Sequence, residues 1–478
     1  MPDSAAQQPT VPSSFGPMLL AALLFGGAIY YSRGEYTETA IVPVVGALIV
    51  VAIQFAQAAG KHDGASGLWQ AAASMAFAAC FGSAFFAFMD AQPIIYPHQA
   101  WTAIKDAQLW ALVLVLTYIP FLWGRLKERA VLRHVRFAAF GLLLAFGGSK
   151  VITISPEPVI DVWTVQQAGA AVLSSGENPY TTIRMADSHT NQAGFVPYVY
   201  PPTQVYLTLP AWKFAGDVRY SMLVALLATG TMLRLIARRG KGEQTPSILE
   251  DAPALMLWLS PKLPFILEQS WVDPMQLMLI TAAFTAAAYR KRRLTTILLG
   301  VVLTAKQTMF WAVGIVGLSL GLRPREWLVV AGVGAAAVLP FAIWNFEALR
   351  YANFTFLNGL PPRSEALTVL NWAQRVFHYD INPRIAFPLT ALVVLAAFFW
   401  FRGSLARTAI AVAFAYAIFF MFNKWAFANY YFLLMGLACL AAACAVHTEP
   451  GWEGWWPPLG EWFARLRGRR ATASPPKP

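Results

Sequence analysis

Charged residues are scarce in this sequence. Only 13% of its 478 residues are Asp, Glu, Lys or Arg, whereas 57% are hydrophobic. A typical soluble domain is roughly 25% charged, so this composition excludes a disordered or fibrous chain and argues strongly against a soluble enzyme. Cysteine is nearly absent as well. Cys80, Cys439 and Cys444 lie in apolar runs and form no CxxC pair, so the sequence supports neither a zinc site nor a disulfide framework.

The charges that are present are mostly basic. The chain has 36 Lys and Arg against 24 Asp and Glu, a formal net charge of +12. Nucleic-acid binding and basic cytoplasmic loops of a membrane protein could each explain this excess. The basic residues cluster in short segments between apolar runs, namely Arg125–Arg136, Arg234–Lys241, Arg290–Arg293, Arg323 with Arg325, Arg402 with Arg407, and Arg465–Arg470. This placement favours membrane lipids as the surroundings and argues against nucleic acid as a partner.

Long hydrophobic runs dominate the rest. A membrane-spanning helix needs about 20 mostly apolar residues. About fourteen runs fit or approach that length: 16–31, 40–58, 68–88, 107–124, 137–153, 218–237, 251–266, 274–289, 294–305, 307–321, 326–345, 384–401, 405–421 and 430–446. If each crosses once, all six basic clusters and both termini fall on the cytoplasmic side. The expected fold is an all-α polytopic membrane protein.

The connecting segments suggest an organisation into parts. The two largest loops on the outer side are 154–217 and 346–383. We expect an accessory bundle of about four spans at 1–136, a core at 137–346, a second outer loop with C-terminal spans at 347–446, and a cytoplasmic tail at 447–478. No internal repeat is visible. Residues 1–14 lack the basic region of a cleavable signal peptide.

The first outer loop begins with an isolated carboxylate. Asp161 follows the fifth run, and 161–174 can form a helix with Asp161 near its N-terminus, where the helix dipole favours a negative charge. A capping role is the simplest interpretation of that position. Asn178-Pro179 predicts a turn, and 203–214 predicts a helix lying at the membrane interface, anchored by aromatic residues.

The order of short motifs on the outer side carries a family resemblance. The motifs are Asp161 after a span, G-x-N-P-Y at 176–180, Y-x-Y-P-P at 198–202, Glu268–Asp273, Thr304–Gln307, Arg363–Thr368 and Asn423–Tyr431. Together they resemble the GT-C superfamily of membrane glycosyltransferases, most closely glycosyltransferase family 87, over roughly 137–446. Two motifs depart from the family pattern. Glu268 stands where the family has a glycine, and the stretch from Gly300 to Lys306 is one residue longer than the family's G-x-x-x-x-K stretch.

The resemblance implies a GT-C-like helix bundle and a reaction. The donor would be a sugar, mannose in this family, carried on a polyprenyl phosphate, and the acceptor a lipid or glycan. Transfer would occur with inversion on the outer, periplasmic face of a bacterial inner membrane. Asp161 would be the general base. No cofactor is expected. A divalent metal stays open, although the six His are scattered and Trp163 occupies the place of a second acid after Asp161.

Four basic residues are candidates to bind the donor phosphate: Lys306, Lys424, Arg363 and Arg350. Lys306 and Lys424 could instead be interfacial lysines that extend to water. Arg363 offers a guanidinium suited to phosphate but follows two prolines in a loop, and Arg350 precedes Tyr351 in what could equally be an aromatic belt.

Seven further residues are candidates to bind the sugar or the acceptor: Gln269, Asp273, Asn429, Tyr430, Tyr180, Tyr200 and His378. Asp273 could instead cap the helix that starts at Pro274. Tyr430 could belong to an aromatic belt, and a lone loop histidine such as His378 is commonly just solvated.

Two other classes of function compete with the enzyme. A flippase or secondary transporter is the main alternative, and it predicts ionisable residues at mid-membrane, of which the runs hold few. A membrane scaffold without chemistry is the third, and it leaves the ordered motifs unexplained.

Overall fold

The computed structural model describes residues 13–59, 69–90, 102–122, 126, 128–158, 160–183, 185–186, 195–239, 246–401, 403–446 and 455. In this part of the chain, eight segments are helical, long and apolar enough to cross a membrane. They are built on α1 (Phe15–Ser32), α2 (Glu38–Ala59), α3 (Trp69–Met89), α4 (Thr102–Leu116), α5 (Ala130–Ile154), α9 (Arg219–Arg238), α15 (Pro324–Arg350) and α20 (Ala428–Val446). The chain is therefore an all-α, membrane-embedded protein.

The remaining apolar runs form shorter helices: α10 (Ser247–Trp258), α11 (Leu263–Glu268), α12 (Asp273–Ala288), α13 (Arg292–Leu303), α14 (Phe310–Leu320), α18 (Ala386–Trp400) and α19 (Leu405–Met421). The prediction of one continuous span at 251–266 is wrong, because the helix breaks before Leu263, around Pro261, which has no amide hydrogen to donate. The helix α13 is about 18 Å long, against a hydrocarbon core of about 30 Å. The count of about fourteen crossings is not confirmed.

The described basic loops lie together at one end of the molecule, here called the basic end. Contacts join them in turn: Arg234 donates to the Arg133 carbonyl, the Arg239 guanidinium lies over the Tyr289 ring, Arg292 pairs with Glu326, and Gly403 N–H donates to the Ser319 carbonyl. The expected clustering is thus seen in space. Arg125, Lys127, Lys241, Arg402 and the tail residues other than Trp455 lie outside the described residues.

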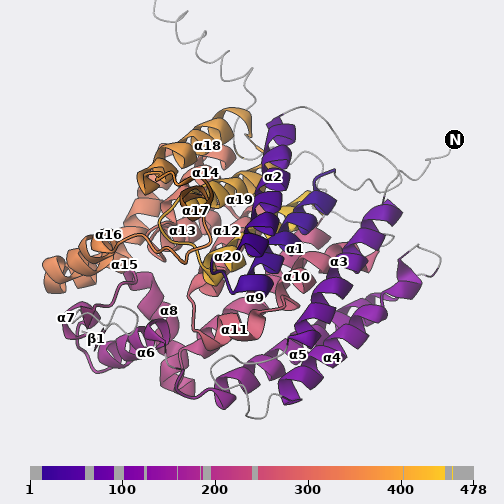
Figure 1. Cartoon of the computed structure of the whole chain (residues 1–478), viewed down its shortest axis with the longest axis horizontal. Coiled ribbons are helices and arrows are strands. Elements are labelled where there is room, and N and C mark those ends of the chain that lie inside the picture. The colour runs from indigo at the N-terminus through magenta and orange to yellow at the C-terminus, as the bar shows by residue number, and fades with distance from the viewer. Residues whose placement is uncertain are drawn as a thin grey trace, which may run out of the picture.

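Small elements gather at the opposite end, as Figure 1 shows. They are α6 (Asp161–Ser174), α7 (Pro179–Thr182), β1 (Met185–Ala186), β2 (Phe195–Val196), α8 (Pro202–Ala215), η2 (Tyr351–Thr355) and α16 (Phe356–Gly359). The strands pair antiparallel, with Met185 opposite Val196. Tyr180, Tyr198, Val205 and Phe341 form their shared core. We call α6 to α8 with β1 and β2 the cap. The helices predicted at 161–174 and 203–214 are confirmed, while their place relative to the membrane stays a prediction.

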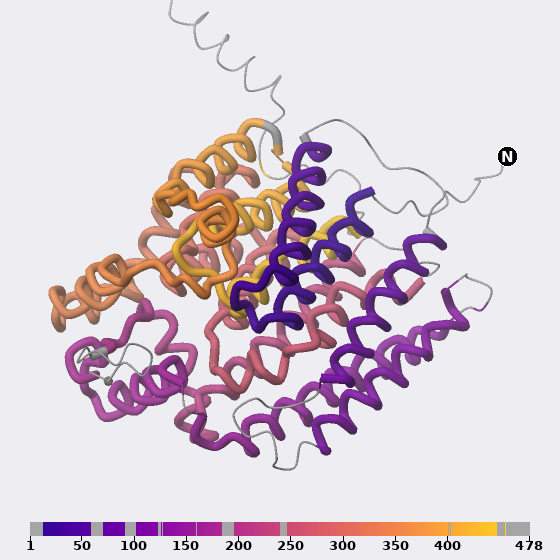
Figure 2. Tube along the Cα trace, in the orientation of Figure 1, coloured from indigo at the N-terminus to yellow at the C-terminus, as the bar shows by residue number. Residues whose placement is uncertain are grey.

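The first helices pack directly on the last ones. Figure 2 shows the indigo α1 beside the yellow α20, and α1 contacts α20 more than it contacts any other helix. Gly34 has a φ of +79°, and a side chain there would collide with the Ala428 backbone. The Tyr36 N–H donates to the Glu365 carbonyl over 2.7 Å. The loop after α1 therefore fixes the start of α20. The division into an accessory bundle and a core stays a prediction.

The second outer loop contains one further helix, α17 (Val369–Phe377), and a short 3₁₀ turn at Pro383–Ile385; another such turn, Ile119–Phe121, follows α4. The helix α15 departs from helical geometry at Asn345, where φ is −162°. At 1.5 Å per residue this bend lies about 32 Å from the start of α15, roughly the thickness of the hydrocarbon core. The polypeptide beyond it extends alongside the cap (Figure 1).

Candidate functional site

A buried ion pair stands at the end of the helices opposite to the basic end. Lys306 Nζ donates to Asp273 Oδ1 over 2.9 Å, and Asn429 Nδ2 donates to Asp273 Oδ2 over 2.9 Å. Asp273 is fully buried and Lys306 is 9% exposed. The Asp273 side chain does not cap α12, whose N-cap is Val272. Three of the predicted site residues, which come from three distant segments, therefore meet at one carboxylate.

Lys306 occupies the turn between the short helices α13 and α14. Its ammonium lies 4.7 Å from the centre of the Tyr430 ring. Burial lowers the pKa of Lys306, but Asp273 and Tyr430 together outweigh it and hold this pKa above its ordinary value. Because the ion pair keeps the lysine charged, a fixed positive charge stands at this end of the helices.

Hydrogen bonds attach this turn to the cap. Thr304 and Thr203 share a hydrogen bond of 2.7 Å between their hydroxyl groups. Gln307 Nε2 donates to the Val199 carbonyl over 2.8 Å. The cap is thus held over Lys306 by groups on both sides of it.

Tyr200 lies within electrostatic range of both Asp161 and Asp273. Burial raises the pKa of Tyr200 well above its ordinary value, and the negative charges of Asp161 and Asp273 raise it further. Its carbonyl accepts the Tyr180 hydroxyl over 2.7 Å. Tyr200 therefore stays protonated at neutral pH, and its neighbourhood holds two carboxylates from separate elements.

Asp161 is the first residue of α6 and is half-buried. Its Oδ1 accepts the Val162 N–H over 2.8 Å, a contact at the helix terminus where a carboxylate is favoured. The N-cap of α6 is Ile160, with no side-chain cap bond, so Asp161 lies in the first turn and is not the cap itself. The proximity to Tyr200 places the same side chain within the candidate site.

The Gln269 segment is buried beside the site. Gln269 is 7% exposed and ends α11. Ser270 has a φ of +58°, and its carbonyl accepts Gln166 Nε2 over 2.7 Å. Gln204 Nε2 donates to Gln166 Oε1 over 3.3 Å. This amide network joins α6 and α8 to the turn before Asp273.

The other predicted phosphate ligands have partners other than Asp273. Arg350 pairs with Glu347 on an exposed face, over 2.7 Å, and Arg363 pairs with Glu365. Lys424 Nζ donates to the Leu357 and Leu360 carbonyls over 2.9 and 2.6 Å, where α16 ends. Burial lowers the pKa of Lys424. These three cations already bind groups of the protein itself.

A polar cleft of about 590 Å³ opens between α17, the turn at Pro383–Ile385 and Lys424. Gln374, Asp380 and Arg384 are among the residues that line it. His378 is exposed at the end of α17 and is not among them. The cleft offers amide, carboxylate and guanidinium groups on the same side of the molecule as the ion pair.

Several buried polar groups escaped the sequence analysis. Arg219 is fully buried; it pairs with Asp217 over 2.6 Å and donates to the Ser155 carbonyl, which ties the end of α5 to the start of α9. At the basic end, Asp251 binds Arg234 and Tyr118, each over 2.6 Å. In the sequence, only the opposite charges at positions 217 and 219 pointed to the Asp217–Arg219 pair. No sequence signal pointed to Asp251, which lies within an apolar run.

Among the described residues, no group of three or more His, Cys, Asp or Glu side chains could hold a metal ion. Comparisons with family models, with curated proteins and with solved structures found no match for this chain. The assignment of a function therefore depends on the geometry of the site and on the motif resemblance.

Proposed function

We propose that this chain is a GT-C-like glycosyltransferase that transfers a sugar, mannose by resemblance to family 87, from a polyprenyl phosphate to a lipid or glycan acceptor. The observation that carries the proposal is the pairing of two carboxylates of different character around Tyr200. Asp273 is fully buried, with both oxygens bound by Lys306 and Asn429, whereas Asp161 is half-buried at a helix terminus.

This difference assigns the roles. The acceptor hydroxyl attacks the anomeric carbon, its proton passes to the Asp161 carboxylate, and the bond from that carbon to the phosphate oxygen breaks with inversion. Tyr200 stays protonated, so it donates a hydrogen bond and does not act as the base. Asp273 holds Lys306 in position.

The charge that develops on the leaving phosphate needs a fixed cation nearby. Lys306 fits that role because it keeps its charge and has two further N–H bonds beside the one directed at Asp273. The polar cleft next to Lys424 suits the acceptor, since its amide and charged groups match the hydroxyl groups of a glycan. In this scheme Arg350, Arg363 and Lys424 order the outer loops and do not bind the phosphate.

A transporter of lipid-linked substrates is the second candidate, and the Asp273–Lys306 pair is the observation that favours it, because ionisable residues buried in membrane proteins commonly mark substrate pathways. However, Lys306 lies in a turn and Asp273 begins its helix, and both stand at the end of the helices that the cap covers. The polar chemistry at one end supports the enzyme.

The test is label transfer by protein reconstituted in liposomes that contain polyprenyl-phosphate mannose and candidate acceptors. Asp161→Asn should lower the rate by about 10²–10⁴-fold, the contribution of a general base. Glu157→Gln, in the same loop, is the control and should keep the wild-type rate. Full activity of a correctly folded Asp161→Asn protein would rule out the assignment of the base, and donor crossing the bilayer without label transfer would support the transporter.

A further inference from the structure

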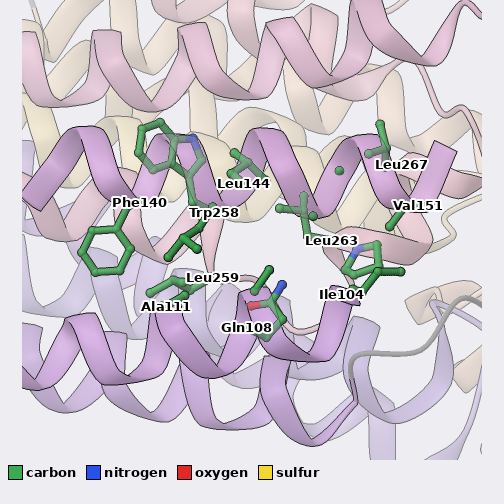
Figure 3. Close-up of a pocket in the computed structure, with 15 residues that line it drawn as sticks. Ile104, Gln108, Ala111, Phe140, Leu144, Val151, Trp258, Leu259, Leu263 and Leu267 are labelled. Carbon is green, nitrogen blue, oxygen red and sulfur yellow. The ribbon is translucent and has the colours of Figure 1, made fainter. Parts of the chain in front are cut away.

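The polar cleft beside α17 is large enough for a small molecule. Its volume of about 590 Å³ lies within the range of roughly 300–1,000 Å³ that is usual for small-molecule sites. The groove between α4 and α5 in Figure 3 differs from it. That groove has free space of only about 30 Å³, room for about one water, and its walls are apolar apart from Gln108 and the Trp258 indole. Of these two cavities, the polar cleft is the one that can hold a ligand.

Three asparagines give the cleft hydrogen-bonding groups of fixed direction. Asn371 Nδ2 donates to two backbone carbonyls over 2.8 and 2.6 Å, so its Oδ1 is left as an acceptor. Asn382 Oδ1 and Asn423 Oδ1 each accept a backbone N–H, over 3.0 and 2.7 Å, so their Nδ2 groups are left as donors. The free end of each amide has no partner within the described residues. Because a sugar hydroxyl both donates and accepts, fixed acceptors and donors side by side match a glycan.

The charges that line the cleft are two basic groups and one acidic group. Lys424 Nζ is already occupied by backbone carbonyls where α16 ends. The side chains of Arg384 and Asp380 have no hydrogen bond or ion pair with any described residue. The Arg384 guanidinium therefore keeps its whole fork of N–H donors, which matches a carboxylate or a phosphate. Since the basic charge exceeds the acidic charge, the cleft favours a ligand that carries a negative group.

A short stretch of chain connects the cleft to the ion pair. Lys424 lines the cleft, and Asn429 donates to Asp273 over 2.9 Å. Five residues of extended chain cover at most about 18 Å between their Cα atoms. The Leu367 N–H donates to a carbonyl of this stretch over 3.0 Å and holds it against the second outer loop. A glycan of a few sugar units can thus occupy the cleft and extend toward the ion pair.

We propose that the polar cleft binds an acidic glycan, an oligosaccharide that carries a carboxylate or a phosphate group. The asparagine amides and Gln374 bind its hydroxyl groups, and Arg384 pairs with its negative group through two N–H donors. The inference rests on the proposed function only in taking this glycan to be the sugar acceptor. Arg384 thereby determines the specificity for an acidic acceptor.

The experiment is calorimetric titration of the full chain in detergent, without donor, against four trisaccharides. They form two matched pairs, trigalacturonate with its neutral methyl ester and maltotriose phosphate with maltotriose. Wild-type protein should bind at least one acidic probe about ten-fold more tightly than its neutral counterpart, as expected for a hydrogen bond between charged groups. The pair with the larger difference identifies the negative group as a carboxylate or a phosphate.

Three variants assign the binding to the cleft. Arg384→Gln should remove the preference for the acidic probe and leave binding of the neutral probe unchanged. Arg350→Gln is the matched control and should keep the preference, because that guanidinium pairs with Glu347 and does not line the cleft. Gln374→Ala should weaken binding of acidic and neutral probes alike by about two- to ten-fold, the value of one neutral hydrogen bond.

Two results would overturn the proposal. They are equal binding of the acidic and neutral probes by the wild type, and an unchanged preference in Arg384→Gln. Label transfer plays no part in the titration, so binding that depends on Arg384 would support the proposal even if the protein transferred no sugar. Label transfer to neutral acceptors alone would contradict the acidic glycan and leave the glycosyltransferase standing.

Discussion

Asp273 is a buried carboxylate whose stability depends on two partners. Burying a charge is expensive, and the cost is offset only when partners of good geometry satisfy its oxygens. Lys306 and Asn429 supply those partners at 2.9 Å each. Removing the lysine alone leaves an uncompensated charge, whereas removing both charges leaves a neutral site.

This difference gives the first prediction. Lys306→Met should lower the free energy of unfolding by about 3–5 kcal/mol, the usual cost of breaking a buried ion pair. The double variant Lys306→Met with Asp273→Leu should recover most of that loss while remaining inactive. Thermal unfolding in detergent measures both proteins. Equal losses in the single and double variants would contradict the electrostatic explanation.

The same pair predicts a pH dependence. The pKa of Lys306 is higher in the folded chain than in the unfolded chain, where a lysine has a pKa of about 10.4. The charged lysine therefore stabilises the fold fully below that pH. This stabilisation is lost only as the pH rises through the raised pKa of the folded chain. The difference in melting temperature between wild type and Lys306→Met should therefore be constant from about pH 6 to about pH 9 and shrink only in stronger alkali. A difference that disappears near neutral pH would show that Lys306 is not held charged.

At the scale of elements, the crossing of α13 and α15 positions the turn that holds Lys306. A Cβ on Gly300 would lie 2.6 Å from the Val333 Cβ and 2.8 Å from the Val330 carbonyl oxygen. Gly300→Ala should therefore push α13 away from α15, destabilise the protein by about 1–3 kcal/mol and reduce transfer activity. Gly332→Ala, with no atom within 4 Å of its Cβ, is the matched control and should stay near wild type in both assays.

Sequence patterns predicted the helices well, because long apolar runs and a carboxylate at a helix start are local signals. The start of α6 at Asp161 and the extent of α8 followed from them. The short run at 294–305 also anticipated the short helix α13, whereas the break before α11 did not follow from hydropathy, because hydropathy measures composition and not backbone geometry. The meeting of Asp273, Lys306 and Asn429 was not predictable either. Each residue was singled out, but their contact depends on how three distant segments pack.

The whole molecule has two chemically different ends. At the basic end, buried acids such as Asp251 bind arginines of the basic clusters, such as Arg234. At the other end, the cap and the second outer loop cover the ion pair. Part of the basic charge is therefore paired with acids inside the protein at one end, and the candidate chemistry is concentrated at the other.

This polarity can be tested by labelling. Ser175 and Arg293 are both exposed but belong to opposite ends, and the three native cysteines are buried. In intact cells a cysteine at position 175 should react with a membrane-impermeant maleimide, while a cysteine at 293 should react only after lysis. The reverse pattern would place the cap in the cytoplasm.

The short helices α13 and α14 have a consequence for biosynthesis. Each is about half as long as the segment that a bilayer needs, and Arg292 at the start of α13 contacts the Gly321 carbonyl just after α14. Neither helix can be anchored as a separate span during translation. We expect the two to enter the bilayer together as one hairpin with Lys306 at its tip, and we expect Lys306 to pair with Asp273, which is synthesised earlier. The order of synthesis thus supplies the Asp273 carboxylate before the Lys306 ammonium that pairs with it.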